Sequence, residues 1–433
     1  MSDRQPPPVI SPQGGVSPFA MREEVPTRTL LGLHVASDCR RLEAALVQIT
    51  GQGSQVEVRI VDQESSPLGE TIAGRFARLR DSHFESPGEM ALLAAELAEV
   101  QAKVAGDLLD RLLAGLPPPL AIGVTDPGLW HLRRNHPPCY ASLCDAAQLA
   151  ARTGINVIDA FAAADLAAGG IGGPVGALPL WLVLRDASRP RILLDLGRTV
   201  RLTYLPAANA PRAIGSILAF DVGPGTSLLD YLARRFSDGK IEFDPGGRLA
   251  VQGRKIDKLI EHWLDAPYFR EPLPRWNPVG VHPYEELEES IRMAAETGWS
   301  VRDLLCTANH LIVRCIERDI ERWIPAHEDV AEILLVGGGA QNGLLLAELG
   351  KCLPGVKLVP ASSQGFDEMS LDAAVAAVLA ALFIERRTAG LPNVTGATSP
   401  SLLGRWTPGS TAAIEGLLRA MAPATADELR RAV

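Results

Sequence analysis

Three glycine-rich turns are the segments of this chain whose residue types best suit phosphate chemistry. They read Asp195-Leu-Gly-Arg-Thr199, Asp221-Val-Gly-Pro-Gly225 and Gly337-Gly-Gly-Ala-Gln-Asn342, and each follows a predicted strand. Glycine lets the backbone approach an anion closely, and a helix that starts after such a turn adds a partial positive charge. Open α/β sheets bind ligands at the carboxyl ends of their strands, so the three turns together predict a nucleotide site.

The same turns supply candidate ligands for a Mg²⁺ ion, which typically takes one or two carboxylates besides phosphate oxygens and water. Asp195 and Asp221 are the predicted metal ligands, although each could instead cap the turn at its strand end. No turn reads GK[ST] or GxGxxG, which disfavours a Walker A loop and a Rossmann dinucleotide site. The residues predicted to bind nucleotide or phosphate are Asp195, Gly197, Asp221, Gly223, Gly225, Gly337, Gly338, Gly339 and Asn342.

The elements that must position these turns form one pattern that occurs twice. Each half begins with short strands in succession and continues with alternating helices and strands, so part of each sheet should be parallel. Ser86 and Ser300, each with an acidic residue three positions later, predict the starts of two long helices. The layout is typical of an α/β, two-lobed actin/hexokinase-like ATPase fold, in which a mixed sheet flanked by helices is duplicated. The predicted strands lie at 30–35, 44–50, 55–61, 120–124, 191–197, 199–206, 217–225, at the start of 332–343, and at 356–360, and the predicted helices at 87–116, 227–236, 301–324 and 371–387.

Length and composition narrow the protein class. A chain of 433 residues is too long for one ordinary core, which favours two lobes. A net charge of −9 disfavours a nucleic-acid partner, and no apolar run reaches the roughly 18 residues that span a membrane. The 6 cysteines lack CxxC spacing and no apolar signal peptide is present, which predicts reduced thiols and a cytoplasmic location. We divide the chain into a disordered tail (1–29), an N-terminal lobe (30–180), a C-terminal lobe with the nucleotide side (181–408) and a C-terminal segment (409–433).

Several blocks of sequence, in collinear order over residues 30–408, resemble the anhydro-N-acetylmuramic acid kinase family. The segment ARTGINVIDAFAAADLAAGGIGGP (151–174) is similar to a family stretch with ARTG, a strand, and then GDFRRRD-type and GGQGAP motifs. The turn in FDVGPGTSLLD (220–230) resembles the family's DTGPGN segment, and LLVGGGAQNGLLLAEL (334–349) resembles its adenosine loop. Further similar blocks are DAPYFREPLPR (265–275) and RRTAGLPNVTGA (386–397).

This resemblance implies an ATP-dependent sugar kinase that uses Mg²⁺ and acts on a small sugar. Such enzymes open the 1,6-anhydro ring of anhydro-N-acetylmuramic acid with water and phosphorylate O6, in peptidoglycan recycling. The carboxylate that activates the water aligns with Asp165, for which a helix N-cap is the alternative role. The resemblance leaves a homodimer open, and it implies substrate contacts from Trp130, His131, Gly169 and Gly170.

Departures from the family pattern fall on groups that would bind phosphate and sugar. The family's SGTSxDG loop is Val35-Ala-Ser-Asp-Cys-Arg-Arg41 here, and it has lost both glycines. Its HGQTxxH-type segment corresponds to residues 125–131, which keep only the Trp-His end. The remaining changes put Ala163 and Ala164 in place of an Arg pair, Arg275 in place of Lys, and Leu196-Gly-Arg-Thr-Val200 in place of a second phosphate turn.

Three arginines, Arg40, Arg41 and Arg198, could supply charge to phosphate in place of the lost groups, or could be solvated surface residues. The losses also leave open two alternatives to the anhydro sugar kinase. One is a pseudokinase that binds a partner or a nucleotide without turnover, and the other is a kinase for a different polyol or cell-wall fragment. A γ-phosphate ordered near Val35 to Arg41 in an ATP complex would favour a kinase over the pseudokinase.

Overall fold

The first of two β-sheets is built from the N-terminal part of the chain. The computed structural model describes residues 27–36, 39–80, 86–111, 116–131, 137–278, 297–325, 329–365 and 370–421. In this first sheet an antiparallel meander, β1 to β3, continues into two strands parallel to β1, and one antiparallel strand closes the edge. Its order is β3 (Glu57–Pro67), β2 (Arg41–Thr50), β1 (Thr27–Val35), β4 (Ala121–Thr125), β7 (Asn156–Asp159) and β13 (Arg405–Thr407).

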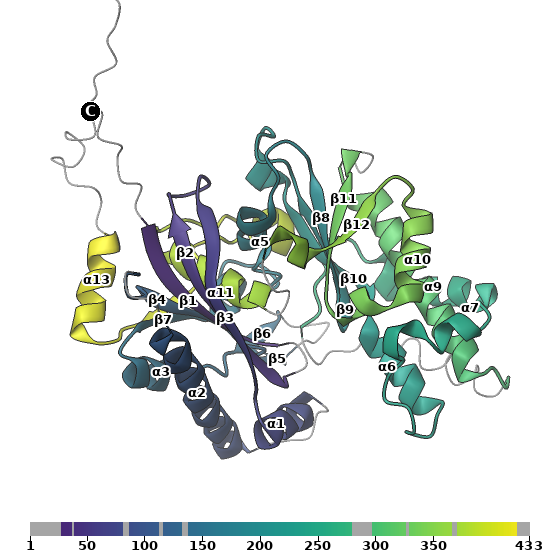
Figure 1. Cartoon of the computed structure of the whole chain (residues 1–433), viewed down its shortest axis with the longest axis horizontal. Coiled ribbons are helices and arrows are strands. Elements are labelled where there is room, and N and C mark those ends of the chain that lie inside the picture. Colours follow the sequence, from purple (N-terminus) through teal and green to yellow (C-terminus); the bar gives the residue numbers. More distant parts are fainter. Residues whose placement is uncertain are drawn as a thin grey trace, which may run out of the picture.

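The second sheet repeats the arrangement of the first. Its meander is β8 to β10, and β11 and β12 follow in parallel on the other side of β8. This duplication is that of the actin/hexokinase-like ATPase fold, so the predicted fold class is confirmed; Figure 1 shows the two sheets in neighbouring lobes. The order is β10 (Leu218–Pro224), β9 (Thr199–Leu205), β8 (Arg191–Leu196), β11 (Glu332–Val336) and β12 (Lys357–Pro360).

Amphipathic helices cover the outer face of each sheet. Leu93, Leu97 and Leu108 of α2 pack with β1 and β2, as their spacing predicts. Ser86 caps α2, and Ser300 forms the expected reciprocal capping box with Asp303 at the start of α9. The first sheet carries α1 (Glu70–Arg80), α2 (Pro87–Asp110) and α3 (Ala146–Thr153), and the second carries α6 (Thr226–Arg235), α7 (Asp257–Leu264), α9 (Val301–Trp323) and α10 (Gly343–Cys352).

Two further helices, α5 (Ala177–Leu184) and α11 (Leu371–Ile384), belong to the apolar cluster that joins the sheets. The alanine-rich α11 lies directly on β1 and β4, where Gly32 and Gly123 allow the approach. A Cβ atom on Gly32 would lie 1.7 Å from the carbonyl oxygen of Ala373, and one on Gly123 would lie 2.0 Å from that of Ala376. Glycine at these two positions is therefore a steric requirement for the helix to seat.

The C-terminal part of the chain returns to the first sheet. Besides α11, both β13 and α13 (Thr411–Met421) contact β7, so these three elements lie with the N-terminal lobe in space. The predicted lobe boundary between residues 180 and 181 stays a prediction. These C-terminal elements follow the second lobe in sequence but pack on the first lobe. Within the predicted tail, Thr27 already begins β1, and residues 1–26 lie outside the described part. Among the described residues, no helix is both long and apolar enough to cross a membrane.

Candidate active site

Two connected hollows lie between the lobes, and together they form the candidate active site. We call the smaller one, of about 240 Å³, the aromatic cavity, because Trp130, Tyr140, Phe161 and Trp276 line it. The larger one, of about 850 Å³, is the arginine groove, since its wall contains Arg40, Arg41, Arg198, Arg201 and Arg234. The second volume is in the range of ligand pockets and suits a nucleotide, whereas the first suits one sugar ring. The residues shared by both walls are His34, Leu180, Asp195, Arg198, Arg201, Thr203, Ser227 and Asp372.

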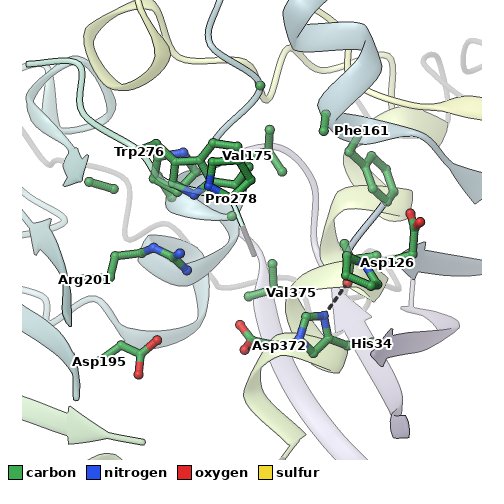
Figure 2. A pocket seen from close by; sticks show the side chains of 18 of the residues that line it. His34, Asp126, Phe161, Val175, Asp195, Arg201, Trp276, Pro278, Asp372 and Val375 are labelled. Carbon is green, nitrogen blue, oxygen red and sulfur yellow. Dashed lines mark hydrogen bonds and ion pairs between the residues drawn. The ribbon is translucent and has the colours of Figure 1, made fainter. Parts of the chain in front are cut away.

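Asp195 is the last but one residue of β8 and lies at the junction of the two hollows (Figure 2). Burial raises the pKa of its carboxyl to about 7, against the opposing effect of nearby Arg201. Gly337, with φ of +84°, allows the neighbouring turn to come close, because a Cβ atom there would lie 2.7 Å from both Asp195 Oδ1 and the Gly197 nitrogen. A carboxylate that burial makes costly to ionise, at the edge of a phosphate-sized groove, is chemically suited to a divalent cation.

The turn after β10 is not exposed to the groove in the way the sequence predicted. The backbone N–H groups of Gly225, Thr226 and Ser227 donate to the carbonyl oxygens of Gly197 and Arg198, at 2.9, 2.8 and 3.3 Å. The first amides of α6 are therefore used to hold the β8–β9 turn. Gly225 packs against that turn, and Gly223 lies beside Phe269. Neither glycine is part of the groove wall, so their predicted phosphate contact stays a prediction without geometric support.

Only part of the third glycine turn faces the groove. Gly337 and Gly338 line the groove, whereas Gly339 packs on Leu196. Asn342 caps α10 by accepting from the Leu345 amide, and its side-chain amide donates to Asn309 at 2.9 Å. Of the residues predicted for the nucleotide, the structure therefore places Asp195, Gly197, Gly337 and Gly338 in the walls of the cleft.

Asp221, the second predicted metal ligand, is fully buried and lies behind the cleft wall. Its carboxylate accepts from Arg201 Nε at 3.0 Å and from the Asn277 amide at 2.7 Å. Arg275 Nε donates to the Asp221 carbonyl at 2.6 Å, and its guanidinium also pairs with buried Asp319. These contacts orient Arg201 and hold the segment that carries Trp276. In this geometry Asp221 positions other groups, and its metal role stays a prediction.

Asp165, the predicted catalytic base, lies in α4 (Phe161–Ala167) and is fully buried. Its carboxylate accepts from Thr395 Oγ1 at 2.7 Å and from the Gly172 amide at 2.9 Å. Burial raises its pKa, and these two hydrogen bonds oppose the rise. The carboxylate is absent from the cavity wall, which Ala160 and Ala162 of the same segment form instead. The structure thus gives Asp165 a positioning role between α4 and α12 (Pro392–Thr395), and leaves its catalytic role a prediction.

Of the residues predicted to contact the sugar, one lines the aromatic cavity and the others lie outside its wall. Trp130, in β5 (Leu129–His131), lines the aromatic cavity, whereas His131 is exposed and lies outside that wall. Gly169 and Gly170 pack against Thr398 and Asp165, and neither lines the cavity. Only Trp130 of these four is placed to touch a ligand.

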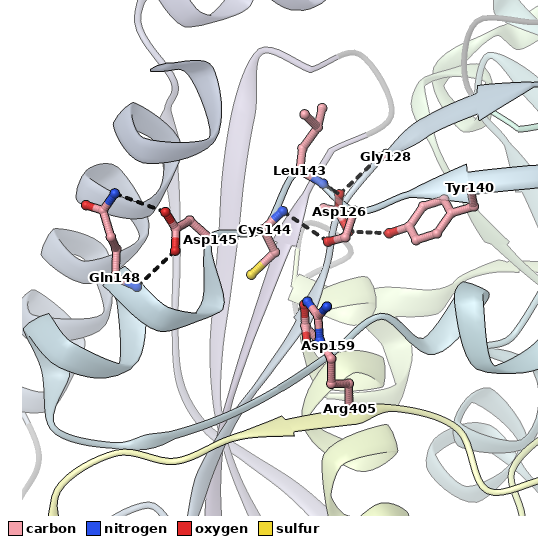
Figure 3. Close-up of polar contacts among 10 residues, drawn as sticks. Asp126, Gly128, Tyr140, Leu143, Cys144, Asp145, Gln148, Asp159 and Arg405 are labelled. Carbon is pink, nitrogen blue, oxygen red and sulfur yellow. Dashed lines mark hydrogen bonds and ion pairs between the residues drawn. The ribbon is translucent and has the colours of Figure 1, made fainter. Parts of the chain in front are cut away.

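An aromatic cluster that the motifs did not predict completes the sugar side. The ring centroid of Trp130 lies 4.8 Å from those of both Tyr140, in β6 (Cys139–Ala141), and Trp276. Asp126 fixes this wall, since it accepts from Tyr140 Oη at 2.5 Å, and from Ser142 Oγ and the Leu143 and Gly128 amides at 3.1, 2.6 and 3.1 Å (Figure 3). Aromatic faces suit the apolar face of a sugar ring.

His34 is the other cleft residue that the sequence reasoning missed. It lies near the carboxyl end of β1, with Nδ1 at 2.8 Å from Oγ1 of Thr125, its partner on β4. Its Nε2 lies 3.7 Å from Oδ2 of Asp372, at the start of α11. Burial lowers the pKa of His34, against the opposing effect of Asp372. A neutral imidazole therefore faces the cleft at neutral pH.

The three arginines proposed to compensate for lost glycines are wall residues of the groove. Arg40 and Arg41 enter it from the first lobe and Arg198 from the second. Residues 37 and 38 of the altered loop lie outside the described part. A groove with cations on both sides suits an anionic ligand that bridges the lobes.

Comparisons with known proteins identify the family to which the chain is similar. Residues 29–409 match the family model described as anhydro-N-acetylmuramic acid kinase. The chain is 32% identical over 381 residues to the anhydro-N-acetylmuramic acid kinase of Gloeobacter violaceus, covering 86% of this chain and 97% of that protein. It is 30% identical over 384 residues to the protein of that name from Synechococcus elongatus, covering 87% and 98% of the two chains.

Proposed function

The chain belongs to the anhydro-N-acetylmuramic acid kinase family, and we propose that it transfers the γ-phosphate of ATP to O6 of a 1,6-anhydro amino sugar as water opens the anhydro ring. The observation that carries this proposal is the continuity of the two hollows at Asp195. A nucleotide in the arginine groove would direct its terminal phosphate at this junction. A sugar in the aromatic cavity would meet it there.

On the nucleotide side, Arg198 and Arg201 would contact the phosphates, and Gly337 and Gly338 would let the backbone approach them. Asp195 is the residue we assign to Mg²⁺, because its buried carboxylate has the oxygen donors and the electrostatic need for a cation. Mg²⁺ bound there would offset negative charge on the transferring phosphate. Arg201, held in orientation by Asp221, would remain directed toward the cleft.

On the sugar side, Trp130 and Trp276 would stack against the ring and exclude water from the junction. Gly172 and Gly173 are required by these rings, because a Cβ atom on either would lie 2.7 Å from Trp130 or Trp276. The glycine run that the family pattern contains thus supports the aromatic wall in this chain.

A specific observation favours a second candidate substrate, an anhydro amino sugar without the lactyl carboxylate. Among the described residues of the aromatic cavity wall, the cations are His34 when protonated, Arg198 and Arg201, and all three also line the arginine groove. The wall also carries Asp126, Asp195 and Asp372. The family's Arg pair is Ala163 and Ala164 here. Without that pair the chain lacks two cations that could attract a carboxylate, so 1,6-anhydro-N-acetylglucosamine is the matched alternative to the muramic acid sugar.

The test is to supply Mg-ATP with each of the two sugars and to measure ADP release and the 6-phosphosugar by mass spectrometry. We expect one of them to give a product whose formation needs both ATP and Mg²⁺. Higher kcat/KM for the neutral sugar would select the second candidate. ATP binding without turnover of either sugar would select a pseudokinase over both.

The proposed reaction suggests a metabolic role and a cellular location. Anhydro amino sugars are fragments of peptidoglycan, so this reaction would return a cell-wall fragment to metabolism as a phosphorylated sugar. Because ATP is the phosphate donor, we propose that the protein acts in the cytoplasm.

A further inference from the structure

One row of polar side chains crosses the first sheet where its strands reach the cleft. Glu43 on β2 pairs with His34 on β1 in the antiparallel ladder, and Thr125 on β4 pairs with His34 on the other side. Residues paired in this way point to the same face of a sheet, and the Cβ atoms of an antiparallel pair lie roughly 5 Å apart. The proposed reaction gives none of these three side chains a role.

The start of α11 places a carboxylate over this row. Gly32 lies two residues before His34, on the same face of β1, and its missing Cβ lets the carbonyl oxygen of Ala373 approach the strand. Asp372, the neighbour of Ala373 in the first turn of α11, thereby comes to lie with Oδ2 at 3.7 Å from His34 Nε2. Potential ligand atoms of His34, Glu43 and Asp372 all lie within 4.8 Å of one another.

The contacts of the His34 ring are those of a metal ligand. The Thr125 hydroxyl lies 2.8 Å from Nδ1 and fixes the plane of the ring, so that Nε2 is directed at Asp372 (Figure 2). Metal-binding histidines almost always have their second ring nitrogen held by a hydrogen bond. The 3.7 Å between Nε2 and Oδ2 exceeds a direct hydrogen bond, but it is close to the roughly 3.4 Å that separates two ligands of one tetrahedral Zn²⁺ ion.

We propose that His34, Glu43 and Asp372 bind a divalent transition-metal ion of the Zn²⁺ or Mn²⁺ class. One imidazole and two carboxylates suit these ions, whereas Mg²⁺ prefers oxygen ligands alone. Three protein ligands leave at least one coordination position open. All three residues line the arginine groove, and the side chain of Asp372 is 60% exposed, so the open position faces that groove.

The charges around the three ligands attract a cation. Glu43 and Asp372 bring two carboxylates together, and a dication between them offsets the repulsion of like charges. Asp195 on β8 adds a third carboxylate, whose charge acts on Asp372. Arg201 on β9 opposes a cation, since its charge acts on both His34 and Asp372. The carboxylates outnumber this guanidinium.

The ion has a use in the cleft that the chain's altered loop does not supply. His34 and Asp372 line both hollows, as Asp195 does, so an ion held by them lies beside the junction. Its open position would take an oxygen of the terminal phosphate from the side of the first lobe, where the glycines of the family's SGTSxDG loop are lost. This use rests on the proposed function, whereas metal binding itself does not.

The test of the site needs neither nucleotide nor sugar. Tag-free protein is stripped of metal with a chelator, and Zn²⁺ and then Mn²⁺ are titrated by calorimetry. We expect one Zn²⁺ ion per chain, bound more tightly than Mn²⁺. His34→Ala and Glu43→Gln should weaken Zn²⁺ binding at least about 100-fold, because losing a ligand costs more than the roughly 10- to 100-fold cost of losing a supporting partner. Thr125→Val, which removes only the supporting hydroxyl, should weaken it about tenfold.

His310→Ala is the matched control. His310 Nδ1 lies 3.7 Å from Glu348 Oε2, the same separation as in the proposed site, and His310 lies outside the described walls of both hollows. Its Zn²⁺ affinity should equal that of wild type. Asp372→Asn is the variant to rely on where thermal melts show that Glu43→Gln does not fold, since Asp372 is exposed. Wild type that binds no Zn²⁺, or an affinity that His34→Ala and Asp372→Asn leave unchanged, would overturn the site.

The use of the ion is tested separately by nucleotide binding. Protein loaded with Zn²⁺ and dialysed free of excess metal should bind Mg-ATP about tenfold more tightly than metal-free protein, and His34→Ala should show no such difference. Equal Kd values for loaded and metal-free wild type would overturn the contact with phosphate. A wild type that turns over neither sugar would overturn the proposed function, and the Zn²⁺ titration would still decide the site.

Discussion

Apart from the edge strand β13, the two sheets have the same strand order, yet their residues differ at corresponding positions of that order. In the second sheet Asp195 pairs with Val336, the last residue of β11; in the first, His34 pairs with Thr125, the last residue of β4. The residue that follows the partner strand is Gly337 in the second half and Asp126 in the first.

This difference shows how a duplicated fold assigns two tasks to one position. In the second half, glycine exposes backbone beside a carboxylate, which suits phosphate and a cation. In the first half, the glycines are replaced and side chains line the cleft: Asp126 holds the aromatic wall, and His34 is part of the walls of both hollows. The same crevice at the carboxyl ends of the strands thus receives the phosphate from one lobe and the sugar from the other.

The sharpest test of the phosphate half is Asp195→Asn. Loss of the carboxylate should lower kcat by about 10³-fold, because transition-state charge at the junction loses its cation site. The raised pKa of Asp195, about 7, adds a second expectation. A proton on Asp195 stabilises the fold at low pH, and this contribution is lost as pH rises from about 4 to 7, so the Asn variant should have the higher Tm at pH 8. Thermal unfolding of wild type and Asp195→Asn at pH 5 and pH 8 checks this expectation. Equal Tm values for the two proteins at pH 8 would contradict it.

Gly337→Ala tests whether the close approach of the Gly337 backbone to Asp195 and Gly197 is needed for stability and ATP binding. A Cβ atom in this left-handed conformation would contact Asp195 Oδ1 and the Gly197 nitrogen at 2.7 Å, so the turn must shift. We expect a loss of about 1–3 kcal/mol in unfolding free energy and weaker ATP binding. Gly338→Ala is the control for stability, since a Cβ atom there meets nothing within 4 Å. Equal Tm values for the two variants in thermal melts would show that the close approach is unimportant.

Trp276→Ala tests the sugar half alone. The ring packs edge-on against Trp130 and forms part of the aromatic cavity, but it is not part of the described groove wall. We expect KM for the sugar to rise about tenfold while KM for ATP stays unchanged. Steady-state kinetics with each substrate varied in turn measures this. A parallel rise in both KM values would mean that the two hollows are not separate in function.

Arg198→Ala should have the smallest effect. Its guanidinium lines both hollows and is partly exposed, so we expect ATP to bind about fivefold more weakly, with a loss that shrinks as salt is added. Arg41→Ala makes the same change on the first lobe. Calorimetric titration of both at two salt concentrations compares the lobes, and undiminished affinity in Arg198→Ala would assign that arginine to the solvated surface.

The sequence predicted the fold well because its signals are local. Strand meanders, the caps at Ser86 and Ser300, and glycine turns each lie within a few residues, and all were found in their expected places. The C-terminal return was missed, because β13 pairs with a strand more than two hundred residues earlier. Pairing at that distance leaves no trace in a local pattern.

The site was predicted less completely, for the same physical reason. The structure places the predicted site residues Asp195 and Trp130 in the cleft walls, and each lies at the end of a short, recognisable segment; their roles stay predictions. Asp165 fits the motif, but Thr395 and Gly172, which occupy its oxygens, can be identified only in three dimensions. His34 and Trp276 lie outside the motifs that were matched to chemistry. The one local signal for His34 is a polar residue near the end of an otherwise apolar strand.

The seating of α11 on the first sheet has a consequence for biosynthesis. A ribosome makes β1 and β4 early, but the helix that covers Gly32 and Gly123 emerges only near the end of translation. Until then one face of the N-terminal sheet has no native cover, although domains in general fold as they are made. The nascent chain must therefore keep this apolar face from aggregating while the second lobe is synthesised, and a premature stop before residue 371 would leave a product that lacks this cover altogether.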